Sequence, residues 1–182
     1  MHDLEKMVNI METEYQLYNT LLDLSQKKTH AIANGKIKDL EKLVEAEEHL
    51  VLELSRVEDE RERCAAELAR QLGMDSKDVT ISNLISHAEG ELAERLSELQ
   101  KKINKQISEQ KRVNRLNEQL IKNNLEYINF SLGLLTGGGQ PGDGQLQQLQ
   151  FALRWRHVLR ADQLLCPHQM WQVSITVGSN AV

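Results

Sequence analysis

The segment THAIANGKIKDLEKLVEAEEHL, residues 29–50, decides the fold because it ends one helix and begins another with almost no chain between them. Apolar residues at three- and four-residue steps run up to Ile32, and the next such series begins at Ile37. Asn34 and Gly35 separate the two series. A glycine just after the last periodic residue can take the left-handed conformation that closes a helix. So short a connection predicts two neighbouring antiparallel helices.

The same periodicity, followed in both directions, predicts three helices over residues 3–33, 36–72 and 81–135. Thr80 is placed to cap the third helix. We expect a kink near Gly90, since glycine inside a helix costs up to about 1 kcal/mol relative to alanine. The predicted fold class is all-α, an elongated antiparallel three-helix bundle or coiled coil. The first helix should span ~45 Å and the part of the third from Leu92 onward roughly 65–70 Å, so the third should extend beyond a partner.

The composition changes after residue 135. Lys and Glu are abundant before this point and absent beyond it, whereas both tryptophans and both prolines follow it. The glycine-rich residues 137–145 predict a flexible linker. Two interpretations of the apolar tail, residues 146–182, stay open. It forms an extra helix (146–165) and a strand (171–177) that dock on the third helix, or it is a disordered end created by a shifted reading frame.

The residues that could carry chemistry are scattered. No His-x-x-x-His or Glu-x-x-His pair supplies metal ligands, and Cys64 and Cys166 have neither metal-binding nor disulfide spacing. The sequence contains no Walker loop, dinucleotide fingerprint or G-x-S-x-G motif. We therefore expect a protein that is not an enzyme, with no catalytic, cofactor-binding or metal-binding residues. Cys64 is predicted to be a small core side chain.

The charge pattern argues against nucleic acid as a partner. The net charge is −5, whereas phosphate binding needs a concentrated positive face. The basic residues between 101 and 115 alternate with glutamates, so we interpret them as a solvated, salt-bridged helix surface in preference to an anion-binding patch. Glu45, Glu47 and Glu48 are interpreted as solvent-facing in the same way.

The sequence also gives no sign of membrane insertion. The first residues lack the basic and apolar regions of a secretory leader, and no segment approaches ~18 uncharged apolar residues. We therefore expect neither secretion by a signal peptide nor a membrane-spanning segment.

The end of the third helix is its most apolar part. An apolar stripe that extends beyond its bundle forgoes about 1.5–3 kcal/mol for each large side chain left in water. Before this end, polar residues interrupt the seam of the helix, and such residues weaken a coiled coil while restricting its register. These polar residues are Gln110, Asn114, Asn117 and Asn124. A helix end that its own bundle satisfies poorly is a candidate docking site for another helix.

A family resemblance is visible around the first turn. The segment KKTHAIANGKIKDLEKLVEAEEHLVLELSRVEDERERCAAELARQLG, residues 27–73, resembles the FlgN family of flagellar type III export chaperones. Shared features are a lysine-containing helix end, a glycine turn, and a helix with Leu, Glu-Glu, Leu and Glu-x-x-Arg in this order. The later segments VTISNLI and NLEYINFSLGLL are similar to the start and end of that family's third helix. The resemblance covers about residues 1–136, and the tail departs from it.

The resemblance implies a cytoplasmic chaperone that binds the C-terminal helical segments of the hook–filament junction proteins FlgK and FlgL. It also implies delivery of these cargoes to the export gate and contact with the cytoplasmic domain of FlhA. An amphipathic cargo helix would lie in a helical groove, with Tyr127 as the aromatic anchor. The candidate cargo-binding residues are Leu120, Ile121, Leu125, Tyr127, Ile128, Leu132 and Leu135.

Two alternatives stay open. The same apolar residues could complete the bundle's own core or a dimer interface, since apolar stripes on helices usually pack within a core. The protein could also be a structural coiled-coil scaffold or adaptor that self-associates through this stripe.

Overall fold

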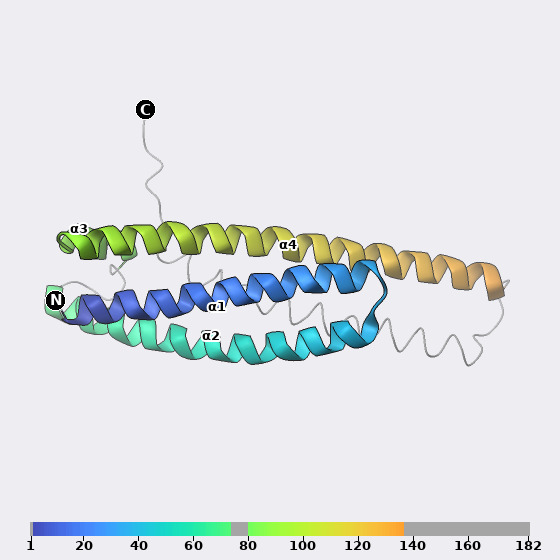
Figure 1. Ribbon diagram of the computed structural model, residues 1–182, viewed down its shortest axis with the longest axis horizontal. Helices are drawn as coiled ribbons and strands as arrows, with labels where there is room; N and C mark the ends of the chain where they lie inside the picture. Colours follow the sequence, from blue (N-terminus) through green and yellow to red (C-terminus); the bar gives the residue numbers. More distant parts are fainter. Residues whose placement is uncertain (1, 74–79, 137–182) are drawn as a thin grey trace, which may run out of the picture.

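The structure, a computed structural model, describes residues 2–73 and 80–136. The described residues form four helices and no strand: α1 (His2–Ala33), α2 (Ile37–Leu72), α3 (Ile81–His87) and α4 (Glu91–Thr136). Figure 1 shows a long, thin bundle in which α1 lies between α2 and α4. The predicted all-α class is confirmed. The helix and strand expected in the tail lie outside the described residues.

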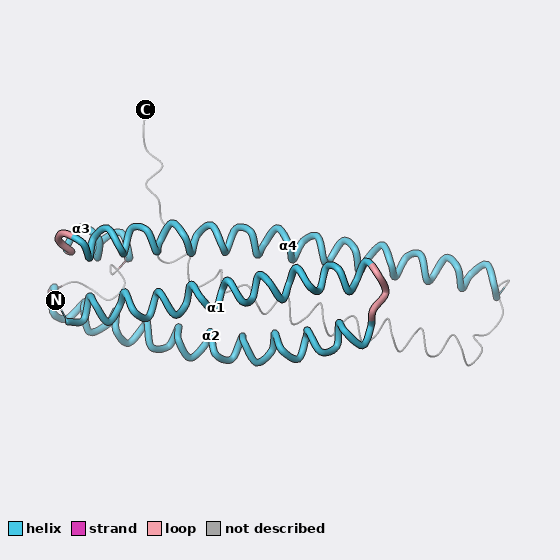
Figure 2. The backbone as a smooth tube through the Cα atoms, viewed as in Figure 1, coloured by secondary structure: helices cyan, strands magenta, loops and turns pink. Residues whose placement is uncertain are grey.

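The turn between α1 and α2 is built around Gly35. This residue has a φ of 62°, and a Cβ added there meets nothing within 4 Å, so backbone conformation and not space requires glycine. The Lys36 N–H donates to the Ala31 carbonyl (2.9 Å) and the Gly35 N–H to the Ile32 carbonyl (3.2 Å). These bonds satisfy carbonyls that the end of α1 leaves open. The turn is the short loop between the two helices in Figure 2.

The main apolar core receives side chains from all four helices. Met11 of α1, Leu54 of α2, Leu84 of α3 and Leu96 of α4 are all buried in it. Helix α1 makes the main contacts with both α2 and α4. Cys64 is also buried in this core, as its sequence context predicts. The central helix therefore holds the other two long helices together.

Helix α3 begins at a side-chain cap. The Thr80 Oγ1 accepts a hydrogen bond from the Asn83 N–H at 3.1 Å, as the sequence predicts. The chain then leaves helical geometry at Ala88, which is extended, and at Gly90, whose φ is 58°. A single kinked helix was predicted here, but the structure has two separate helices.

Helix α3 folds back along the beginning of α4. The Gln100 Nε2 donates to the Ser82 Oγ at 3.2 Å, which joins the two helices across the turn. Glycine alone suggested a kink, but Ala88 to Gly90 together reverse the chain. The reversal buries Ile81 and Leu84 in the core, and that burial compensates for the helical hydrogen bonds lost at the break.

A buried polar layer crosses the bundle between its two apolar clusters. The Lys28 Nζ lies 2.6 Å from the Glu47 Oε2, and both side chains are only 1% exposed. The Gln110 Nε2 donates to the Ser25 Oγ (2.6 Å), and the Asn117 Nδ2 donates to the Ser25 carbonyl (3.0 Å). Helix α1 is therefore tied to α2 by an ion pair and to α4 by amide hydrogen bonds.

The prediction that Glu47 faces solvent is wrong. Glu45 and Glu48 are exposed, but Glu47 lies seven residues from both Leu40 and Leu54, which are buried. Seven-residue spacing places the three side chains on one side of α2. A run of glutamates looks solvated in the sequence because the compensating charge, from Lys28, belongs to another helix.

Candidate functional site: the free end of α4

Paired polar side chains fix how far α4 extends beyond its neighbours. Near the start of α4 the Arg95 guanidinium contacts the Glu12 carboxylate (2.7 Å), and much later the Asn124 Nδ2 donates to the Ile32 carbonyl (3.2 Å). Because both partners advance along their helices in the same order, α1 and α4 run parallel. Helix α1 ends at Ala33, one residue after its contact with Asn124.

The last part of α4 consequently has no α1 beside it. Residues 126–136 continue the helix for about 16 Å at 1.5 Å per residue. Figure 1 shows this segment running past the α1–α2 turn. We call residues 126–136 the free end of α4. The mismatch in helix length that the sequence predicts is therefore present.

Three of the seven predicted cargo-binding residues pack into the bundle. Ile121 is 1% exposed and forms a small apolar cluster with Ile32 and Leu40. Leu120 and Leu125 are partly buried against this cluster. These side chains complete the core beside the α1–α2 turn, immediately before the free end begins.

The other four residues belong to the free end itself. Tyr127 is 73% exposed. Ile128, Leu132 and Leu135 lie in α4, but their side chains are outside the described part of the structure. The sequence analysis did not select Phe130, which is 66% exposed. Its position three residues after Tyr127 was the available signal, since that spacing brings two aromatic rings to neighbouring positions on a helix.

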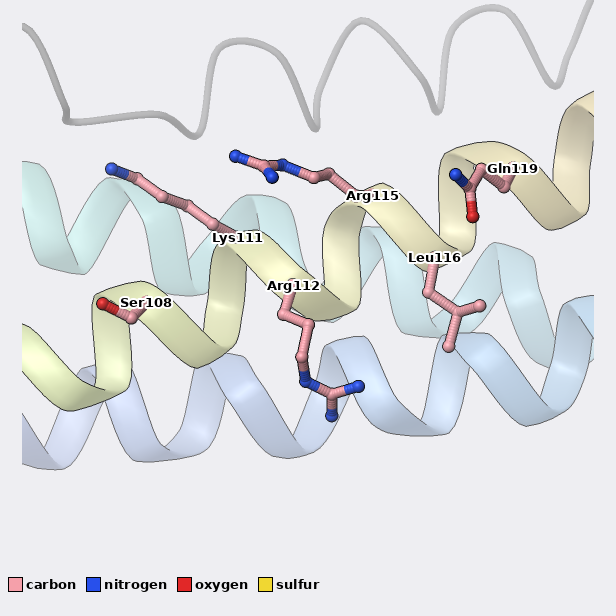
Figure 3. A pocket seen from close by; sticks show the side chains of 6 residues that line it. All are labelled: Ser108, Lys111, Arg112, Arg115, Leu116 and Gln119. Atoms are coloured by element: carbon pink, nitrogen blue, oxygen red, sulfur yellow. The ribbon is translucent and has the colours of Figure 1, made fainter.

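The outward side of α4 is basic. Figure 3 shows Ser108, Lys111, Arg112, Arg115, Leu116 and Gln119 along this helix. The Arg112 guanidinium donates two hydrogen bonds to Glu109 (2.6 and 3.0 Å), which lower the pKa of that carboxyl. Lys101 and Arg115 form no ion pair with any described residue. The predicted salt-bridged surface is therefore present, but it is incomplete.

One acidic group in the core has a perturbed pKa. The Glu14 side chain is 1% exposed, and burial raises its pKa to about 7, although the nearby Arg61 lowers it. The Arg61 Nε lies 3.5 Å from the Glu14 Oε1, and the Glu14 Oε2 has no hydrogen-bond partner. Burial also raises the pKa of Glu58, which lies 3.7 Å from the Arg61 Nη2. This cluster joins α1 to α2 far from the free end of α4.

The described residues offer little for other kinds of site. They contain no group of three or more His, Cys, Asp or Glu side chains placed to hold a metal ion. None of the helices within residues 2–73 and 80–136 is both long and apolar enough to cross a bilayer. Among the described residues, the distinctive feature is thus a helix end that extends past α1 and carries exposed aromatic side chains.

Comparison with known proteins identifies the family. The sequence profile of the FlgN family, described as FlgN protein, matches residues 1–148. The chain belongs to the FlgN family. It is also similar to YvyG, an uncharacterized protein of Bacillus subtilis (strain 168), with 31% identity over 119 residues that cover 65% of this chain and 72% of YvyG. No solved structure matches.

The family assignment confirms the resemblance drawn from the α1–α2 turn. FlgN proteins are flagellar export chaperones that bind hook-associated proteins, and the family is not known for enzymatic activity. The profile match covers all four described helices and continues beyond Thr136. The free end of α4 is therefore part of the family's own domain.

Proposed function

We propose that this protein is a cytoplasmic export chaperone for FlgK-like and FlgL-like hook-associated proteins. It binds their C-terminal helical segments, keeps them unassembled, and delivers them to the cytoplasmic domain of the FlhA export gate. The observation that carries this proposal is the free end of α4, an apolar helix segment beyond the reach of α1 in a FlgN-family chain.

A cargo helix can lie along the free end on the same side of α4 that α1 covers in the earlier part of this helix. Ile121 occupies that line and is buried against α1 and α2. Positions 128 and 135 follow Ile121 at seven-residue steps, so the same line of the helix continues past Ala33. The cargo would thus extend the α1–α4 contact with a helix from another chain, as in helix-in-groove recognition.

The aromatic side chains add anchors at the edge of this line. Tyr127 is more exposed than any of the other large apolar or aromatic side chains described. Aromatic residues dominate binding energy when a partner removes them from water. A cargo helix that covered Tyr127 together with Ile128 and Leu132 would bury three large side chains, each contributing about 1.5–3 kcal/mol before the cost of ordering the cargo.

This mechanism needs no chemistry from the chaperone. A cargo helix held on α4 cannot pair with its assembly partner, because one apolar face cannot serve two contacts. Release at the gate then requires only a partner that binds the cargo-free chaperone more tightly than the cargo-bound one. The FlhA cytoplasmic domain is the partner we propose for that step.

Calorimetric titration of the full chain with C-terminal fragments of FlgK and FlgL from the same organism tests the proposal. The variant Ile128→Asp/Leu132→Asp should lose binding while its helix content, measured by circular dichroism, is retained. The matched control is Leu72→Asp, an exposed leucine at the far end of α2, which should bind both fragments normally. One-to-one binding is expected for the unaltered protein.

The gate step has its own measurement. The purified FlhA cytoplasmic domain should bind the chaperone–cargo complex and should not bind the cargo fragment alone. The free end of α4 is not the cargo-binding site if the unaltered chain binds no cargo, or if Ile128→Asp/Leu132→Asp binds cargo as well as the unaltered chain does.

A further inference from the structure

The exposed apolar side chains of the bundle fall on two helices. Among the described residues, the large hydrophobic side chains that remain exposed are Ile37, Leu52 and Leu72 on α2, and Leu116, Tyr127 and Phe130 on α4. Leu52 is 59% exposed in the middle of its helix, far from any terminus. Isolated exposed leucines are ordinary, so the residues around Leu52 and Leu116 decide whether these two matter.

Leu116 lies within a basic face. Exposed residues at three- and four-residue steps surround it along one side of α4. This basic face consists of Lys101, Lys105, Ser108, Arg112, Arg115, Leu116, Gln119, Lys122 and Asn123. Between Lys101 and Asn123 the face contains no acidic residue. The exposed Glu98 precedes it, and the exposed Glu126 and then Phe130 continue its line toward the end of the helix. Figure 3 shows the central part of it.

Leu52 lies within an acidic face. Exposed residues at the same kind of spacing line one side of α2. This acidic face consists of Ile37, Glu41, Glu45, Glu48, Leu52, Ser55, Asp59 and Glu62. From Ile37 to Glu62 none of its members is basic, and the exposed Arg63, four residues after Asp59, marks its end.

The two faces match in spacing when the helices run antiparallel. Glu45 and Glu62 are as far apart in sequence as Lys122 and Lys105, so both pairs can lie opposite each other at once. In the same register Leu52 lies opposite Arg115, and Leu116 is the next residue along α4. Both chains then place an exposed leucine near the centre of a line of opposite charges.

At the ends of the faces, this register places one favourable pair and one unfavourable pair opposite each other. Ile37 falls opposite Phe130, which pairs two exposed apolar side chains. Glu41 falls opposite Glu126, which brings two acidic side chains together. Like charges directly opposed are unfavourable, so this position offers a specific test of the register.

The two faces do not meet within one chain, since α1 lies between α2 and α4. The net charge of −5 and Glu126 beside the basic line disfavour nucleic acid and anionic lipid as occupants. An acidic helix of matching length and spacing fits better, and α2 of a second copy is such a helix.

We propose that the basic face of α4 binds the acidic face of α2 from a second copy of this chain. The association depends on charge complementarity around two central leucines. In this register it reaches the free end at positions 126 and 130, whereas the proposed cargo contact uses positions 127, 128 and 132. It is therefore independent of cargo binding.

Sedimentation equilibrium of the full chain across concentration and ionic strength tests this proposal. We expect reversible self-association that weakens about tenfold or more in Kd between low and high salt, because exposed charges are screened. The variant Arg112→Glu/Arg115→Glu should be monomeric at concentrations where the unaltered chain associates. The control Lys27→Glu/Lys102→Glu makes the same change in charge at exposed helix positions outside both faces, and should associate normally.

Two further variants separate this contact from a loss of folding or a general charge effect. Combining Arg112→Glu/Arg115→Glu with Glu48→Lys/Asp59→Lys should restore association, because Glu48 and Asp59 lie opposite the uncharged Gln119 and Ser108 and one helical turn from the positions opposite Arg115 and Arg112. Glu126→Lys should strengthen it by removing the opposed acidic pair. Cargo titration of Arg112→Glu/Arg115→Glu should be unchanged, which separates this proposal from the proposed function.

A chain that stays monomeric at all concentrations would overturn the proposal. So would association that survives the reversal of the basic face, or that the doubly reversed chain fails to restore. Association abolished by Ile128→Asp/Leu132→Asp would assign the contact to the free end instead, and would overturn it as well. Binding of the basic face to phosphatidylglycerol vesicles in a monomeric chain would replace a second copy with a lipid surface.

Discussion

The Lys28–Glu47 ion pair gives the most direct test of what holds the bundle in register. The two side chains are each 1% exposed, and the charged atoms are 2.6 Å apart. Removing one partner leaves the other charge buried in a low-dielectric interior. Such single changes cost about 3–5 kcal/mol, whereas replacement of both partners by apolar residues is often neutral or stabilising.

We therefore expect Lys28→Met and Glu47→Leu each to destabilise the protein by about 3–5 kcal/mol. In the first variant the Ser25 Oγ still lies 3.5 Å from the other carboxylate oxygen of Glu47. The double variant should lie within about 1–2 kcal/mol of the unaltered protein. The coupling between the two sites should then be several kcal/mol, far above the ~0.5 kcal/mol expected of distant residues.

Urea denaturation followed by circular dichroism supplies all four free energies of the cycle, with the slope m as a check that the unfolded states remain comparable. A matched control is Lys27→Met/Asp23→Leu, because that ion pair has the same 2.6 Å separation but is 58% exposed on both sides. The control should change stability by less than about 1 kcal/mol. Single variants that lose no more than the exposed control would refute the reasoning.

Two further changes test other features of the fold. Burial raises the folded-state pKa of Glu14 to about 7 from an ordinary value of 4.5. The protonated Glu14 therefore contributes its full stabilisation below about pH 4.5. This stabilisation, about 3 kcal/mol in total, is lost as the pH rises through 7. Urea titrations from pH 5 to 9 should show this loss in the unaltered protein and not in Glu14→Gln, and parallel profiles would contradict it. Thr80→Ala removes the cap that holds the Asn83 N–H and should lower stability by ~1 kcal/mol, measured by thermal unfolding. An unchanged melting temperature would mean that α3 is held by packing alone.

Local sequence was sufficient for the first two helices, the turn between them and the start of α3. The α1–α2 turn follows from Gly35, and the N-terminal cap of α3 follows from Thr80, because each depends on a conformation or hydrogen bond within a few residues. The length of α4 relative to α1 also followed from periodicity, since rise per residue is constant in a helix. Helix lengths therefore predict that α4 extends beyond α1, whereas the end at which it does so is set by the contacts between these two helices.

The reversal of the chain at Ala88 to Gly90 could not be predicted in the same way. Glycine inside a periodic pattern is compatible with a kink, a break or an intact helix, and the choice depends on what else can be buried. Here the burial of Ile81 and Leu84 favours a separate α3 folded against α4.

Thus the sequence by itself determined the all-α class, the α1–α2 turn, the cap of α3, the length of α4 and the family, because periodicity, caps and ordered motifs are local properties of the chain. Only the tertiary structure decided that Glu47 is buried with Lys28, that Ile121 belongs to the bundle while Tyr127 remains exposed, and that a basic and an acidic face lie on separate helices. These outcomes depend on which residue of another helix arrives at each position. Burial and charge pairing depend on contacts between helices, so the sequence of one segment does not determine them.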